Sequence, residues 1–504
     1  MTDFSTRIVA ILAILTASSF VGAAEQNPAA PKDATGTAAK APTTPPAAAK
    51  KTEIIKLVIT PAAEATPLLK YRLTPRFADQ RPGNAAPLYA QAAMTYQPSE
   101  ADEKRIAELL KASPAEFAKF AAEKNSGSLL PESPLSLLRV AARREECRWD
   151  HPLREQNPFS VLMPEQQELR KLARLVALRA RLHGARKEYS EAVEMLSVGY
   201  MMAHHEGKTP VLISGLVGVS IGRIMDEVVL ELAQRAGTPN LYWALTTRPR
   251  PLVEFRLALE AEASALDLSL PILNAAVLKE PGAMDWDAGL DELTEMLQMV
   301  SGMSEENEPT MAKLIARSGR SAMIAGVVVV KGKAMRDFLI ARGLSRERVE
   351  RMGSTQLVLA HEKLMYDEHR DRMFAWMSLP YPQARAGLEE AEKRLKQEMR
   401  DGRATYGWGG LLLPAVASVR WTHARAEREG DVLRLIEALR LFAAENAGAL
   451  PKTLAEVQAK TPLPADCVTG EPFRYASDGA TATLTLPPNR AGADAIVYEI
   501  SVAK

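Results

Sequence analysis

Apolar residues recur at helical spacing along most of the chain, from about residue 100 to about residue 445. Because positions three and four apart share one face of a helix, this pattern predicts a series of amphipathic helices. Ser113-Pro114-Ala115-Glu116 has the composition of a helix start, with a capping Ser, a Pro in the first turn and a Glu three residues after the Ser. In the second half, long helices are predicted over 252–266, 288–302, 309–328, 331–342, 346–369 and 384–400.

One helical hairpin stands out in this pattern. A helix that starts at Glu165 is predicted to end near Gly184, and a second helix is predicted to begin at Tyr189. The segment 186–192 resembles the turn of a tetratricopeptide repeat (TPR), where a small residue such as Ala192 lets two helices approach closely. Since no regular repeat period extends on either side, the fold expected is mainly α, with helical hairpins in a bundle or an irregular TPR-like solenoid.

The two ends of the folded part depart from the helical period. Residues 54–59 have strand character, and 67–75 form a second short extended piece. At the other end, 431–446 predicts one amphipathic helix, and from Phe473 onward apolar positions alternate with a period of two in three short runs. These patterns predict the following organisation: a helical body with a short N-terminal extended arm over 53–430, and a small helix-plus-antiparallel-sheet module, of three strands, over 431–504.

The N-terminus predicts export. Residues 1–24 have a weakly basic start, an apolar run and small residues before the expected cleavage site, which is the pattern of a signal peptide. Whether it is cleaved is left open. Residues 25–52 are rich in Ala, Pro, Thr and Lys without apolar periodicity, and this composition predicts a disordered linker. The expected location is the periplasm or cell envelope, or the extracellular space.

Composition narrows the classes of partner. The formal net charge is +1, so no long-range field selects nucleic acid. The apolar stretches 211–221 and 322–330 are too short to span a bilayer, so no transmembrane helix is expected after signal cleavage. Cys147 and Cys467 are the two cysteines, and their spacing leaves a disulfide and two free thiols both open.

The sequence lacks the usual motifs of catalytic, metal-binding and nucleotide-binding sites. No Gly-x-Ser-x-Gly elbow and no Cys/His signature occurs, and paired carboxylates such as Glu145-Glu146 fit solvated helix faces. His361 and His369 are too far apart on one helix to share a metal, and His423 with Glu427 fits a surface salt bridge. The glycines Gly215, Gly218 and Gly222 follow no strand, which favours close helix packing over nucleotide binding. No catalytic residue, metal site or cofactor is therefore predicted, and an enzyme is not favoured.

The most distinctive local feature is an aromatic and arginine cluster formed by Tyr242, Trp243, Arg248 and Arg250. Trp, Tyr and Arg dominate interaction hot spots, so this cluster is a candidate interaction surface. The alternative interpretation is a structural corner, in which Trp covers the core and Arg stacks on aromatic rings.

Six segments of the chain carry a family resemblance. They are Leu69-Lys70-Tyr71-Arg72-Leu73, Pro82-Gly83-Asn84-Ala85-Ala86, 239–245, Pro249-Arg250-Pro251-Leu252, Leu379-Pro380-Tyr381 and 411–416. Together they resemble a family of uncharacterised exported proteins of planctomycete-type bacteria, and the resemblance covers nearly all of the chain after the signal peptide. It implies no particular activity.

The C-terminal part has a predicted helix, then 448–454, then 466–475, which contains Asp466-Cys467-Val468-Thr469-Gly470. This arrangement resembles the globular end of a type II secretion pseudopilin. Pseudopilins have Pro where this chain has Cys467, and this chain has no pilin N-terminal processing site or long hydrophobic spine. A borrowed module or convergence therefore fits better than a filament subunit. Some pseudopilins bind calcium in this region, but the carboxylates here form no recognisable calcium loop.

Three hypotheses about function follow. The first is a non-enzymatic protein-interaction scaffold of the periplasm or cell envelope, with envelope proteins as partners. The second is an accessory of a type II secretion or pilus-like system that acts through residues 431–504. The third is an enzyme whose site is assembled across helices.

Overall fold

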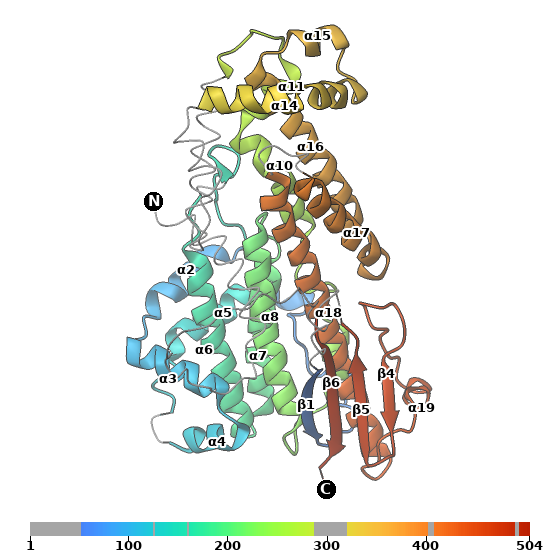
Figure 1. Cartoon of the computed structure of the whole chain (residues 1–504). Coiled ribbons are helices and arrows are strands. Elements are labelled where there is room, and N and C mark those ends of the chain that lie inside the picture. Colours follow the sequence, from blue (N-terminus) through green and yellow to red (C-terminus); the bar gives the residue numbers. More distant parts are fainter. Residues whose placement is uncertain are drawn as a thin grey trace, which may run out of the picture.

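The computed structural model describes residues 52–123, 126–158, 161–286, 320–401, 408–488 and 493–503. The predicted signal peptide, nearly all of the predicted linker, the helix predicted over 288–302 and the first part of the helix predicted over 309–328 lie outside these ranges. Within them the chain is mainly helical, with a small sheet formed near the C-terminus, so the predicted fold class is confirmed (Figure 1).

The helical body begins with four short helices and continues with three long ones. The first group is α2 (Ala86–Thr95), α3 (Glu100–Lys111), α4 (Pro114–Ala122) and α5 (Glu132–Ala142), after a 3-10 turn η1 (Phe77–Asp79). The long helices are α6 (Glu165–Ala185), α7 (Tyr189–Glu206) and α8 (Leu212–Ala233), followed by the short α9 (Tyr242–Thr246). The predicted start at Ser113 is confirmed, because its hydroxyl accepts from the Glu116 amide at 3.3 Å and the Glu116 carboxylate accepts from the Ser113 amide at 2.8 Å.

The described part of the second half carries further helices. These are α10 (Arg256–Ser269), α11 (Pro271–Leu278), α14 (Arg320–Ala341), α15 (Arg346–Arg351), α16 (Ser354–Met377), α17 (Tyr381–Arg400), α18 (Trp408–Glu445) and α19 (Leu454–Gln458). Across the described ranges, no single helix is long and apolar enough to cross a membrane, and only the pair α10 and α11, bent by 74°, passes that test jointly.

The hairpin predicted around residues 184–189 is confirmed as α6 and α7, and Ala192 is fully buried where they meet. Glycines let α8 pack closely against this hairpin and the chain that follows it. A Cβ on Gly218 would lie 2.8 Å from the carbonyl oxygen of Ala203 on α7. On Gly215 it would lie 2.5 Å from the ring of Phe255. The predicted use of these glycines for close packing is therefore confirmed.

We expect Gly218→Ala to lower the free energy of unfolding by about 1–3 kcal/mol, because the added methyl meets backbone that cannot move aside. Urea unfolding followed by circular dichroism measures this. Gly326→Ala in α14 is the matched control, since its added Cβ has nothing within 4 Å. That change should be neutral or stabilise by up to about 1 kcal/mol. Equal effects of the two substitutions would contradict the packing assigned to Gly218.

The sheet joins the two ends of the described chain. Its strands are β1 (Thr52–Ile59), β4 (Arg474–Ser477), β5 (Thr481–Leu486) and β6 (Ala495–Val502), in the order β1-β6-β5-β4. The three predicted strands pair antiparallel, as expected. The sheet nevertheless has four strands, because the arm at 52–59 pairs in parallel with β6 (Figure 1). Leu57 and Ile59 are buried in the core under the sheet, which holds the arm there.

The helix predicted over 431–446 is the C-terminal part of α18, which begins at Trp408. The expected boundary at residue 431 therefore falls inside one continuous helix. Its last part packs under the sheet through Leu435, Ile436 and Leu439. Its earlier part lies beside α8 and α16 in the helical body.

Several local predictions are wrong. The helix predicted over 346–369 is two helices, α15 and α16, and the two helices predicted over 309–328 and 331–342 are one helix, α14, within the described residues. The segment Arg81–Asn84 contains Pro-Gly-Asn, a composition that predicts a turn, yet it is strand β2 and pairs in parallel with β3 (Arg144–Glu146). Glu145 and Glu146, predicted to lie on a solvated helix face, are instead exposed on strand β3, because helix α5 ends at Ala142. Such short strands carry too few residues to show a period of two.

Candidate functional site

A pocket with a volume of about 40 Å³ lies between α8, α18 and the loop that joins α9 to α10. It offers room for one or two water molecules or a group of that size. Its lining residues come from three segments: Val219, Gly222, Arg223 and Asp226 of α8; Leu245 and 248–253; and His423, Ala426, Glu427, Gly430, Asp431 and Arg434 of α18.

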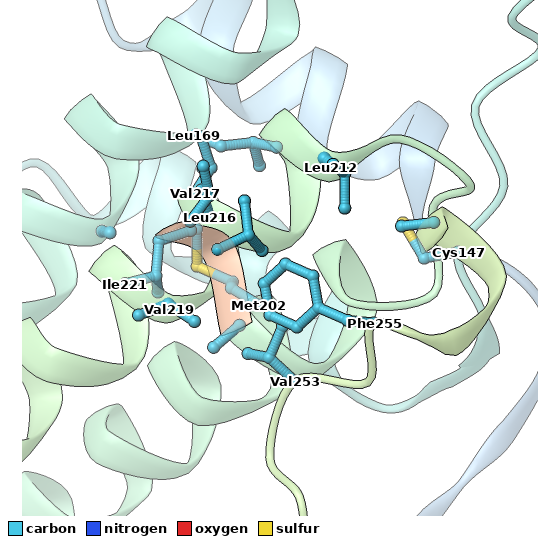
Figure 2. Close-up of a cluster of buried hydrophobic side chains, with 14 of the residues drawn as sticks. Cys147, Leu169, Met202, Leu212, Leu216, Val217, Val219, Ile221, Val253 and Phe255 are labelled. Carbon is cyan, nitrogen blue, oxygen red and sulfur yellow. The ribbon is translucent and has the colours of Figure 1, made fainter. Parts of the chain in front are cut away.

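The loop between α9 and α10 is held by apolar contacts at its end and passes close to a glycine of α18 at its start. Val253 and Phe255 lie among buried side chains that include Leu216, Val219 and Met202 (Figure 2). A Cβ on Gly430 would lie 2.5 Å from the Arg248 guanidinium, so this position of α18 leaves room for that side chain. The part of the pocket wall that this loop forms is thus anchored by buried side chains.

Arg248 reaches inward from the loop. Its Nη1 donates to Asp226 Oδ1 at 3.0 Å, and its guanidinium lies over the ring of Tyr200, 4.5 Å from the centroid. The Tyr200 hydroxyl donates to the same Asp226 oxygen at 2.6 Å. Burial raises the pKa of Asp226, and the Arg248 charge opposes this shift. This carboxyl group is therefore already engaged inside the protein.

Arg250 lies at the open side of the pocket, with 46% of its side chain exposed. Its Nη2 donates to Oδ1 of the buried Asp431, and Arg434 lies 3.5 Å from the same oxygen. Burial raises the pKa of Asp431, and the neighbouring Arg250 lowers it. Two arginines thus share one carboxylate, and the half-exposed Arg250 has more N–H donors than this one contact uses.

His423 and Glu427 lie one turn apart on α18. Arg420 Nη1 lies 3.0 Å from His423 Nδ1, and because arginine can only donate, Nδ1 accepts and the neutral ring carries its proton on Nε2. Burial and the Arg420 charge lower the pKa of His423 to about 3, and a hydrogen bond with the Val253 backbone opposes part of this shift. Nε2 lies 4.0 Å from Glu427 Oε2.

Glu427 differs from the other two carboxyl groups of the pocket. Among the residues that the structure describes, no arginine comes within 4.0 Å of its oxygens. Its side chain is 29% exposed, and burial raises its pKa. The pair predicted as a surface salt bridge is therefore a largely buried contact between a neutral imidazole and a carboxyl group.

The structure separates the predicted aromatic and arginine cluster into two places. Arg248 and Arg250 line the pocket. Tyr242 is 1% exposed, belongs to the core under the sheet and donates its hydroxyl to the Pro462 carbonyl. Trp243 is partly buried and donates from Nε1 to Glu64 at 2.9 Å. Sequence reasoning missed the acidic and histidine residues of α8 and α18, although the His423 and Glu427 spacing was a signal.

Cys147 and the carboxyl group of Asp466 are buried in the fold, and Cys467 is partly buried. Cys147 and Cys467 are free thiols, and burial raises the pKa of both. Asp466, in the turn that resembles a pseudopilin, is buried and bonded to Arg428, with Nε to Oδ1 at 2.8 Å. Within the ranges given above, no group of three or more His, Cys, Asp or Glu side chains is placed to hold a metal ion.

No protein-family model matches this chain, and no curated protein or solved structure is significantly similar to it. The family and pseudopilin resemblances therefore remain predictions.

Proposed function

We propose that this chain is an exported, non-enzymatic binding protein of the cell envelope that receives part of a ligand or partner chain in the pocket between α8, α18 and the 248–253 loop. The observation that carries this proposal is a pocket with charged walls and a half-exposed arginine, Arg250, at its opening. A concave site with a few convergent polar groups is the usual form of a binding site. Export rests on the signal-like residues 1–24.

The other polar groups of the pocket favour binding over catalysis. Asp226 and Asp431 are bonded to arginines, and the only other carboxyl group in the lining is that of Glu427. Acid–base catalysis at a carboxyl pair needs two groups whose protons can move. This pocket offers one.

Filling the pocket tests the proposal. The purified full-length chain is immobilised and exposed to an envelope extract of the source cells, in parallel with Ala426→Phe and Ala444→Phe. Ala426 lines the pocket and Ala444 is exposed on the same helix. We expect at least one species to be retained by the wild type and by Ala444→Phe but not by Ala426→Phe, provided that circular dichroism shows both variants folded. Identical retention by all three proteins would contradict the proposal.

An enzyme is the second candidate, favoured by the raised pKa of Glu427 and the neutral imidazole of His423 one helical turn away. In that case Glu427→Gln should abolish turnover of the retained species while leaving its binding intact. A retained species that the wild type never alters would exclude this candidate.

A further inference from the structure

The end of α7 holds part of the pocket loop in place. His204 Nδ1 donates to the Leu252 carbonyl oxygen at 3.0 Å. A Cβ on Gly207 would lie 2.9 Å from the Glu254 amide nitrogen and 3.0 Å from Val253 Cα, so the glycine lets the loop backbone lie directly against the helix end. Leu252 and Val253 line the pocket. The position of this part of the pocket wall therefore depends on the end of α7.

A buried carboxyl group occupies the same turn of α7. Glu206 is 1% exposed, and its two oxygens accept hydrogen bonds from Trp149 Nε1 at 3.0 Å and from Gln166 Nε2 at 3.1 Å. Within the described ranges it forms no ion pair, and the nearby carboxyl group of Glu165 disfavours its charged form. Because an unpaired charge is costly inside a protein, these surroundings favour the protonated carboxyl group.

The Glu206 side chain and the pocket loop meet at one position of α8. A Cβ on Gly218 would lie 3.4 Å from Glu206 Cβ and 3.2 Å from Val253 Cγ2. Val253 also belongs, with Cys147 and Phe255, to one cluster of buried hydrophobic side chains (Figure 2). Protein interiors are close-packed, so a movement of the α7 end that displaces Glu206 also displaces the side chains packed against it.

We infer that ionisation of Glu206 opens the end of α7 and thereby frees the pocket loop, so that the pocket holds its ligand at mildly acidic pH and releases it above neutral pH. This inference rests on the proposed function of the pocket. Because Glu206 is 1% exposed, its carboxylate reaches water only when this turn moves. The same turn carries His204 and ends at Gly207, and both residues contact the loop.

The direction of the pH effect follows from the proton of Glu206. Burial raises its pKa from 4.5 to about 7, although hydrogen bonds from Trp149 and Gln166 oppose the shift. In the opened turn the carboxyl group has its ordinary pKa, so the open form is favoured as the pH rises and the proton is released. Between about pH 5.5 and about pH 8 the equilibrium constant for opening should therefore rise by up to a factor on the order of 30.

Other titratable and charged groups face this turn from the elements packed around it. Burial raises the pKa of Cys147 and Tyr89 and lowers that of His204 and His205, which favours the neutral form of all four. The remaining groups are Glu165 of α6, His151 in the segment after β3, Lys208 after α7 and Glu254 of the loop. The substitution Glu206→Gln leaves all of these groups in place, so it isolates the contribution of this one carboxyl group.

Hydrogen exchange of the full-length chain tests the opening, because the amides of Gly207 and Thr209 are bonded within this turn. Exchange in peptides that cover 203–209 is followed by mass spectrometry at about pH 5.5 and about pH 8, and each rate is divided by that of the unfolded chain at the same pH. We expect this ratio to rise in the wild type by up to a factor on the order of 30 and to stay constant in Glu206→Gln. Glu194→Gln, at a half-exposed position of α7, is the matched control and should behave like the wild type. Equal ratios for the wild type and Glu206→Gln at about pH 8 would overturn the inference.

A pH shift on the immobilised full-length chain tests the link to the pocket. Species retained from the envelope extract at about pH 5.5 are washed at about pH 8 with constant ionic strength, since salt screens charged contacts. We expect the wild type to release most of the species that Ala426→Phe does not retain, and Glu206→Gln to keep it.

The outcomes separate this inference from the proposed function. If Ala426→Phe loses the species but the wild type and Glu206→Gln release it alike, the inference fails and the proposed function stands. If Ala426→Phe retains the species as the wild type does, the proposed function fails and the inference fails with it.

Discussion

Replacing Arg440 by methionine should lower the free energy of unfolding by about 3–5 kcal/mol, because it leaves a buried carboxylate without its charge partner. The Arg440 side chain on α18 is fully buried, and that of Glu437 is 1% exposed. Nη1 donates to both carboxylate oxygens of Glu437, at 2.8 and 2.9 Å. An unpaired carboxylate in such a place must either stay charged without water or take up a proton, and both cost free energy.

The same side chain joins three segments of the chain. Nε donates to the Thr60 carbonyl at 2.8 Å, just after β1, and Nη2 donates to the Thr238 carbonyl at 3.0 Å, before α9. Glu437 in turn accepts from the Leu241 amide at 2.8 Å. This buried pair therefore holds the N-terminal arm and the segment before α9 against α18.

Two further variants make the measurement specific. Arg440→Met combined with Glu437→Leu should recover part of the loss, since no charge is then left unpaired. Arg256→Met, at a side chain that is 78% exposed, should change stability by less than about 0.5 kcal/mol. Urea unfolding followed by tryptophan fluorescence gives all three values. If Arg440→Met behaved like Arg256→Met, the buried pair would not hold these segments.

Glu206→Gln should stabilise the protein by about 3 kcal/mol at about pH 8 and by almost nothing at about pH 4. Glu206 is the last residue of α7 and is 1% exposed. Burial raises its pKa from 4.5 to about 7, although hydrogen bonds from Trp149 and Gln166 oppose the shift. Below pH 4.5 the folded and unfolded chains both hold the proton. As the pH rises to about 7, the unfolded chain releases its proton while the folded chain keeps it, so the wild type loses stability over this range.

Glutamine fits the same contacts without a titrating group. Trp149 Nε1 donates to Glu206 Oε1 at 3.0 Å, and the glutamine oxygen can accept this bond. The Oε1 atom of Gln166 has no partner among the described residues, so a turned Gln166 amide can accept from the new NH₂ group. Thermal unfolding across the pH range measures the effect. Glu194→Gln, at a half-exposed position of α7, is the control and should leave the pH profile of the wild type unchanged. A Glu206→Gln profile parallel to that of the wild type would show that this carboxyl group titrates normally.

Much of the helical fold could be predicted because it is encoded locally. The α6 and α7 hairpin follows from apolar spacing and from the short turn before Tyr189. The place of β1 could not be predicted, because its partner β6 lies at the other end of the chain and pairing depends on tertiary packing. A glycine such as Gly430 favours a helix end in a sequence pattern, yet α18 continues through it. The absence of a side chain at this position leaves room for the Arg248 guanidinium.

The pocket was predictable only in part. Arg248 and Arg250 stand out in a short loop with two prolines and follow two aromatic residues. Asp226, Glu427 and Asp431 occur in charged helical runs that are indistinguishable from solvated faces until α8 and α18 are packed together. His423 and Glu427 have the spacing of a surface pair. They are largely buried because the loop from Arg248 to Phe255 packs over this part of α18.

The claim that the pocket between α8, α18 and the 248–253 loop receives part of a ligand or partner chain is tested most directly by a crystal structure of the full-length chain with a species that it retains from the envelope extract. The account predicts that part of this species lies in the pocket, in contact with Arg250 and Ala426. A species bound at another place, with nothing from it in the pocket, would contradict the account.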